Sequence, residues 1–132
     1  MKGQQQIFSH ASDDWTTPPD LYKSLNTKYK FSYDPCPLHS KIISLLVPWI
    51  GRVFCNPPYS KIKEFIKKGC EEVKLGNAKI VVFLLPVRTS NAWFHDFLYK
   101  KPNIEIRFLR GRLKFGKSEN SAPFPSMVVV VR

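Results

Sequence analysis

Acidic residues, cysteines and long apolar runs are all scarce in this sequence of 132 residues. Only 10 Asp and Glu stand against 21 Lys and Arg, so the formal net charge is +11. The longest apolar run, Ile80 to Val87, is well short of the ~20 residues that cross a bilayer. Residues 1–10 also lack the charged-then-apolar pattern of an export signal. We therefore expect a cytoplasmic protein without a membrane partner.

The cysteine content is limited to three residues, Cys36, Cys55 and Cys70. The number is odd, no C-x-x-C pair occurs, and no histidine stands at a spacing typical of zinc sites. These features argue against a disulfide framework and against a metal site. We expect reduced thiols that are mostly buried.

The length and the 43% hydrophobic content are sufficient for one domain with a real core. We expect a flexible N-terminal segment at residues 1–14 and a single domain at residues 15–132, with no separate target-recognition domain. The charge of +11 favours a polyanionic partner, because Lys and Arg contacts to phosphates release condensed counterions. Charge alone does not separate DNA, RNA and acidic membranes.

Alternating strands and helices predict an α/β fold with a mostly parallel sheet of about five strands and flanking helices. The unalternating apolar segment at 79–85 is typical of a strand buried on both faces. The last two strands have no helix between them, so they should pair antiparallel. The expected strands are 31–35, 52–56, 79–85, 104–109 and 126–131, and the expected helices are 18–29, 61–75 and 90–99.

Local signals predict how these helices begin and end. Thr17 precedes a Pro-Pro pair and Asp20, which indicates an N-cap. Ser60 is expected to cap the second helix, and Gly76 to end it in the left-handed conformation.

The segment Asn56-Pro57-Pro58-Tyr59 follows a strand, at the edge where parallel α/β sheets bind ligands. An amino group on a heteroaromatic ring becomes nucleophilic when acceptors hold both of its hydrogens. Asn56 Oδ1 and the Pro57 carbonyl are candidates for those acceptors. The prolines stiffen the backbone, and the Tyr59 ring offers a face for a base taken out of its duplex. The alternative is an ordinary turn that ends a strand.

Basic residues dominate the segment from residue 100 to residue 117, which has one acidic residue, Glu105. We expect a phosphate-contacting surface here, and the alternative is a solvated strand face. His39 and His95 have no acidic partner at a fixed spacing, so neither is expected to be catalytic. The basic residues are Lys100, Lys101, Arg107, Arg110, Arg112, Lys114 and Lys117.

With these motifs the chain resembles the compact, phage-type Dam-like family of N6-adenine DNA methyltransferases, in which N-P-P-Y is catalytic. The resemblance covers Trp15 to Val131. It implies a reduced Rossmann-like fold that uses S-adenosyl-L-methionine (AdoMet). The other matching stretches are Trp15–Pro19, Asp34–Cys36, Leu85–Thr89, Gly111–Gly116 and Ala122–Ser126.

The resemblance also implies roles for single residues. Asn56, Pro57, Pro58 and Tyr59 would form the catalytic motif, with Asn56 between methyl donor and adenine. Residues 37–40 stand in place of the family's usual glycine-rich turn. Only 22 residues (56 − 34) separate Asp34 from Asn56, so a carboxylate for the ribose would come from Asp34, Asp13 or Asp14, or be missing. The AdoMet site would comprise Trp15, Thr17, Pro18, Asp34, Pro35, Cys36 and Asn56. The nucleic-acid contacts would come from Tyr59, Arg88, Arg107, Arg110, Arg112, Lys114 and Lys117, with Thr89 near the site.

The resulting hypothesis is methyl transfer to the exocyclic N6 amino group of adenine in DNA, inside a bacterial or phage-infected cell. One alternative keeps the chemistry but takes RNA or a protein amide as acceptor. A second is an inactive nucleic-acid-binding module. Sequence readout would come from loops at 38–48 or 116–125, or from a second copy in a homodimer.

Overall fold

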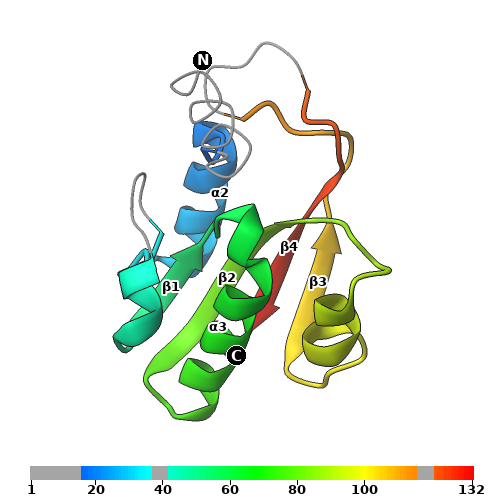
Figure 1. Cartoon of the computed structure of the whole chain (residues 1–132). Coiled ribbons are helices and arrows are strands. Elements are labelled where there is room, and N and C mark those ends of the chain that lie inside the picture. The colour runs from blue at the N-terminus through cyan, green and yellow to red at the C-terminus, as the bar shows by residue number, and fades with distance from the viewer. Residues whose placement is uncertain (1–15, 37–41, 116–120) are drawn as a thin grey trace, which may run out of the picture.

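The computed structural model describes residues 16–36, 42–115 and 121–132, and four strands form one sheet in the order β1-β2-β4-β3 (Figure 1). The strands are β1 (Gly51–Cys55), β2 (Ala78–Pro86), β3 (Ile104–Phe108) and β4 (Ser126–Val131). The helices are α2 (Pro19–Tyr29) and α3 (Ile62–Lys74), with short helical turns η1 (Ile42–Leu46), η2 (Tyr59–Lys61) and η3 (Phe94–Leu98).

The sheet is mixed rather than mostly parallel. Strands β1 and β2 pair parallel, while β4 lies between β2 and β3 and is antiparallel to both. Strands β1, β2 and β3 therefore all run in one direction, and β4 runs in the other. The antiparallel pairing expected for the last two strands is confirmed.

The expected count of five strands is not confirmed among the described residues. In the segment 31–35, only Tyr33 pairs with β1, through an isolated parallel bridge to Val53. The bridge is held by the Phe54 N–H, which donates to the Tyr33 carbonyl at 3.0 Å. Asp34 and Pro35 follow at once, and proline has no N–H with which to extend a ladder.

Two apolar layers cover the sheet, one under α2 and one under α3. Figure 1 shows α3 in front of the sheet and α2 behind it. Alternate residues of a strand face opposite sides of the sheet. Strand β2 therefore contributes side chains to both apolar layers, which is why its sequence is a continuous apolar run. On the α2 side lie Ile80, Val82 and Leu84, and on the α3 side lie Val81, Phe83 and Leu85.

The end of α3 has the predicted glycine, whereas its beginning differs from the prediction. Gly76 has φ +84°, its N–H donates to the Val73 carbonyl, and the Asn77 N–H donates to the Glu72 carbonyl, both at 3.0 Å. This is the Schellman arrangement. The predicted Ser60 cap is wrong, because η2 intervenes and Lys61 takes the N-cap position without a side-chain hydrogen bond.

The N-cap predicted at Thr17 is also wrong. Helix α2 has Pro18 at its N-cap and no side-chain cap hydrogen bond. Its first main-chain bond is donated by the Tyr22 N–H to the Pro18 carbonyl, at 3.0 Å, so Thr17 lies one residue before the cap. One face of the helix is apolar and packs on the sheet, because Leu25 and Tyr29 are buried.

The expected helix at 90–99 is reduced to a few residues that end in the π-helical turn η3. Trp93, Phe94 and Leu98 of this segment are buried. Lys100 then turns the chain with φ +58° before β3 begins.

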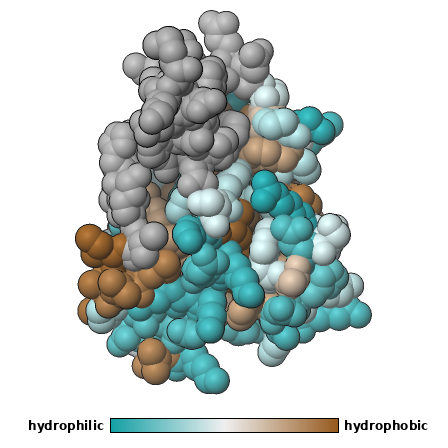
Figure 2. All heavy atoms as spheres, in the orientation of Figure 1, coloured by the Kyte–Doolittle hydropathy of each residue, from teal (hydrophilic) through white to brown (hydrophobic). Residues whose placement is uncertain are grey.

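Apolar side chains are exposed on and beside η1, where Figure 2 shows a hydrophobic area at the left of the molecule. Ile43 is 73% exposed and Leu46 is 80% exposed. None of the helices in the described ranges is both long and apolar enough to cross a bilayer.

Candidate active site

The candidate residues gather at the edge of the sheet where β1, β2 and β3 end, the upper edge in Figure 1. Asn56 follows β1 and Arg88 lies two residues after β2. The antiparallel β4 begins at the same edge, because Ser126 pairs with Pro86. The topology therefore brings together three strand ends and the segment that enters β4.

Asn56 is anchored by a residue far away in the sequence. Its Nδ2 donates a hydrogen bond to Thr17 Oγ1 at 3.0 Å. Asn56 is half-buried and its Oδ1 is shielded from solvent. Pro57 behind it is buried, and Pro58 has an extended backbone with φ −62° and ψ 133°. The amide is thus held on a stiff strand end and tied to the start of α2.

Tyr59 opens η2 and stands between an aromatic ring and a guanidinium group. Its ring meets Phe124 edge-on at 5.4 Å between centroids, and Arg88 Cζ lies 5.6 Å from its centroid. Phe115 continues the aromatic row at 5.9 Å from Phe124. Burial raises the pKa of the Tyr59 phenol, although the Arg88 charge opposes the shift, so the phenol is neutral at ordinary pH. Planar aromatic and guanidinium groups are the surfaces on which bases stack.

The turn Asp34-Pro35-Cys36 lies directly beside β1. Asp34 Oδ1 accepts a hydrogen bond from the Cys36 N–H at 2.7 Å, and Pro35 between them is buried. Cys36 Sγ lies 3.8 Å from the sulfur of Cys55, the last residue of β1. Burial raises the pKa of the Asp34 carboxyl, and the Cys36 N–H opposes that shift. The expected AdoMet turn is therefore in contact with the strand that carries Asn56.

The basic residues expected to contact nucleic acid do not form one surface. Arg110, Arg112 and Lys114 are exposed and follow β3, at the edge that holds Asn56. Lys100 and Lys101 precede β3. The five residues of this strand separate its two ends by about 16 Å. The basic segment is therefore divided between opposite edges of the sheet.

Arg107 lies within β3 and is half-buried. Its Nη1 donates to the Tyr29 hydroxyl at 3.4 Å, so its guanidinium is engaged with α2. Trp15 and Lys117, from the cofactor and nucleic-acid sets, lie outside the described residues, as does His39. His95 is exposed, with Nε2 2.6 Å from the Thr89 carbonyl oxygen.

Comparison with known proteins identifies the relatives of this chain. The family model for DNA N-6-adenine-methyltransferase (Dam) matches residues 4–132. The chain belongs to the Dam family. It is also 32% identical over 97 residues to a DNA N-6-adenine-methyltransferase of Escherichia phage T1, an alignment that covers 64% of this chain and 40% of that protein. The chain thus spans less than half the length of this curated relative, and no solved structure matches it.

Membership of the Dam family confirms the resemblance drawn from the sequence motifs. Two features of the site were not predicted, namely the bond between Thr17 and Asn56 and the packing of Phe124 against Tyr59. A signal for the first is present in the sequence, because both Thr17 and Asn56 stand directly before a Pro-Pro pair. Phe124 lies in a matching stretch, but nothing local indicates its partner.

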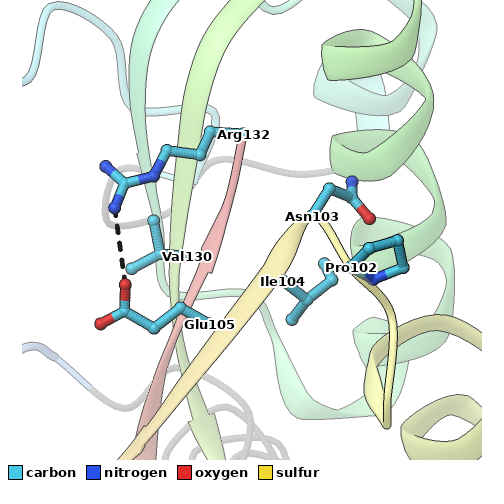
Figure 3. Close-up of a pocket in the computed structure, with 6 residues that line it drawn as sticks. All are labelled: Pro102, Asn103, Ile104, Glu105, Val130 and Arg132. Carbon is cyan, nitrogen blue, oxygen red and sulfur yellow. Dashed lines mark hydrogen bonds and ion pairs between the residues drawn. The ribbon is translucent and has the colours of Figure 1, made fainter.

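A pocket of about 240 Å³ lies at the opposite edge of the sheet from Asn56 (Figure 3). It includes an ion pair between Glu105 and Arg132, with 3.5 Å between Oε1 and Nη2. Both residues lie at the end of the sheet where β3 begins and β4 ends, so this pocket is separate from the candidate active site. Among the residues that the structure describes, no group of three or more His, Cys, Asp or Glu is placed to hold a metal ion.

Proposed function

We propose that this member of the Dam family methylates the N6 amino group of adenine in DNA, with AdoMet as the methyl donor. One observation carries the proposal: the Asn56 amide stands at the end of β1, tied to Thr17 at 3.0 Å and followed by a proline pair and Tyr59. Family membership and the activity named for the phage T1 relative support the same reaction.

The adenine amine is a poor nucleophile, because its lone pair is delocalised into the ring. Acceptors that hold both amine hydrogens favour the pyramidal nitrogen of the transition state, and their placement before the reaction lowers the barrier. Asn56 Oδ1 and the Pro57 carbonyl would be these acceptors. The nitrogen becomes cationic as the methyl group is transferred and then loses a proton readily, so a dedicated base is not required.

Tyr59 would hold the adenine ring in place. Stacking on an aromatic side chain contributes about 1–3 kcal/mol per base. Arg88 lies over the Tyr59 ring, and Phe124 supports its edge. Asn56 Oδ1 is shielded from solvent, so the adenine would have to be turned out of the duplex for its amine to reach this atom.

The residues beside Asn56 fit AdoMet. Asp34 Oδ1 accepts a hydrogen bond from the Cys36 N–H, and the same carboxylate would accept hydrogen bonds from the ribose hydroxyls. Pro18, Pro35 and Cys36 would complete the site, on a sheet that we propose to be a reduced form of the Rossmann-like fold. AdoMet would supply an electrophilic methyl group when bound, and these residues would orient that methyl group towards Asn56.

DNA is the proposed acceptor because the edge that holds Asn56 is also basic. Arg88, Arg110, Arg112 and Lys114 are exposed there, in a chain with a net charge of +11. Contacts of this kind to phosphates position a duplex without reading its sequence.

The proposal is tested by transfer of a labelled methyl group from AdoMet to unmethylated duplex DNA, followed by nucleoside analysis. The expected product is N6-methyladenine, made by the wild-type chain and not by Asn56→Ala. Asn103→Ala, an exposed asparagine at the opposite edge of the sheet, is the matched control and should retain activity. If the label enters RNA and not DNA, the acceptor is RNA and the proposal is wrong on that point. If the chain binds DNA but not AdoMet, it is an inactive nucleic-acid-binding module.

A further inference from the structure

We propose that Thr17 is a positioning residue that holds the Asn56 amide with its oxygen turned towards the substrate amine. The inference rests on the proposed function and adds a role that differs from cofactor contact. The observation behind it is the 3.0 Å hydrogen bond from Asn56 Nδ2 to Thr17 Oγ1, between residues 39 positions apart.

The orientation of this amide decides whether it helps or hinders the reaction. An asparagine side chain offers one acceptor oxygen and a donor NH₂ group, which exchange places when the amide rotates by half a turn. With the oxygen towards the substrate, the amide accepts an amine hydrogen. If the NH₂ group took that place, its N–H donors would face the N–H donors of the substrate amine. They would also compete for the lone pair of the amine nitrogen. A catalyst that uses asparagine therefore needs something to select one of the two orientations.

Thr17 supplies that selection. The two polar atoms of an amide leave the same carbon in different directions, so a nitrogen held at Thr17 Oγ1 turns the oxygen away from Thr17. The Thr17 hydroxyl is available for this because it does not cap α2, which begins after Pro18 without a side-chain cap. Threonine is also branched at Cβ, which restricts its χ1 angle and holds the hydroxyl in place.

Both partners in this bond have stiff backbones. Thr17 precedes Pro18-Pro19, and Asn56 precedes Pro57-Pro58. A residue before proline is restricted to extended conformations, and proline itself has a fixed φ. Little further ordering is needed to bring the hydroxyl and the amide together, so the bond can act as a geometric constraint rather than a transient contact.

Two substitutions separate this role from cofactor binding and from simple packing. Thr17→Val keeps the shape and removes the hydroxyl, whereas Thr17→Ser keeps the hydroxyl and removes a methyl group. We expect Thr17→Val to lower kcat by about tenfold or more at saturating AdoMet and DNA, the scale of one lost hydrogen bond in the transition state. The Kd for AdoMet should stay within about twofold. Thr17→Ser should restore kcat to within about threefold of wild type.

The same variants give outcomes that overturn the proposal. Full kcat in Thr17→Val would show that Asn56 needs no such partner. An increased Kd for AdoMet with unchanged kcat would assign Thr17 to the cofactor. A loss of kcat in Thr17→Ser but not in Thr17→Val would indicate packing by the threonine methyl group.

Failure of the proposed function is distinguished by a measurement that needs no activity. The ¹H–¹⁵N signals of the Asn56 side-chain NH₂ group should shift in Thr17→Val and stay close to their wild-type positions in Thr17→Ser. If the wild-type chain methylates no DNA but these signals shift as expected, the proposed function is wrong and the Thr17 constraint is real. If they do not move in Thr17→Val, the Thr17 inference is wrong whatever the activity.

Discussion

The sulfur atoms of Cys36 and Cys55 lie 3.8 Å apart. Cys36 ends the turn that begins at Asp34, and Cys55 is the residue before Asn56. The contact therefore packs the proposed AdoMet turn directly against the strand that delivers the proposed catalytic amide. It joins two stretches that the sequence presents as separate motifs.

The thiols of Cys55 and Cys70 should react slowly in the folded state. Cys55 is fully buried, and burial raises its pKa well above the usual thiol range, with the neighbouring Cys36 adding to the shift. Burial, with a smaller contribution from Glu71, raises the pKa of Cys70 to about 11. Thiolate is the reactive form, so site-resolved alkylation at pH 8 should label Cys55 and Cys70 quickly only after denaturation. Rapid labelling of Cys55 in the folded chain would contradict the packing described here.

Asp34→Asn should stabilise the fold at neutral pH. Because burial raises the Asp34 pKa above its ordinary 3.8, the folded state binds more protons than the unfolded state between these two values. Stability therefore falls as pH rises through that window, and above it the ionised carboxylate disfavours the fold. Asparagine keeps an oxygen for the Cys36 N–H without the charge. Urea denaturation should show a gain at pH 7 that disappears below about pH 3.8.

The control for Asp34→Asn is Asp96→Asn, which removes one negative charge from the exposed side of η3 and should change stability little. The same Asp34→Asn chain should bind AdoMet more weakly, because it loses the carboxylate proposed for the ribose. A less stable Asp34→Asn chain at pH 7 would show that the carboxylate has a stabilising partner.

Basic residues on the two sides of β3 should differ in their effect on DNA binding. The double variant Arg110→Gln and Arg112→Gln removes charge from the edge that holds Asn56, and Lys100→Gln with Lys101→Gln is the matched control. Each lost phosphate contact reduces the slope of log K against log salt by about 1. Fluorescence anisotropy across a salt series should therefore show a shallower slope in the arginine pair. Equal effects in both pairs would mean that charge acts without regard to position.

Gly69→Ala should destabilise the fold by about 1–3 kcal/mol, the usual cost of overpacking a core. A Cβ at this position would lie 2.5 Å from Phe83 Cζ and 3.3 Å from Trp49 Cζ3, under α3. The better helix propensity of alanine offsets part of this cost. Chemical denaturation measures the change, with Lys67→Ala on the exposed face of α3 as control. A stabilised Gly69→Ala chain would show that Phe83 can move aside.

Several elements could be predicted because their signals are local. The apolar run of β2, the valine-rich β4 and the glycine after α3 each depend on residues that are adjacent in the chain. The two N-caps could not be predicted in the same way. Thr17 and Ser60 are residue types that commonly cap helices. In the structure the Thr17 hydroxyl accepts a hydrogen bond from Asn56 instead, and η2 precedes α3, so that Lys61 and not Ser60 is at the N-cap.

The sequence by itself determined the chemical groups at the site, since Asn56 to Tyr59 follow a strand and stiff prolines hold them there. It also determined the net charge that favours a polyanion. Only the tertiary structure decided that Thr17 holds the amide, that Phe124 packs against Tyr59, and that β3 divides the basic residues. The physical reason is distance along the chain. Propensity and periodicity act between neighbours, whereas hydrogen bonds and ring contacts between remote residues exist only after the sheet has aligned its strand ends.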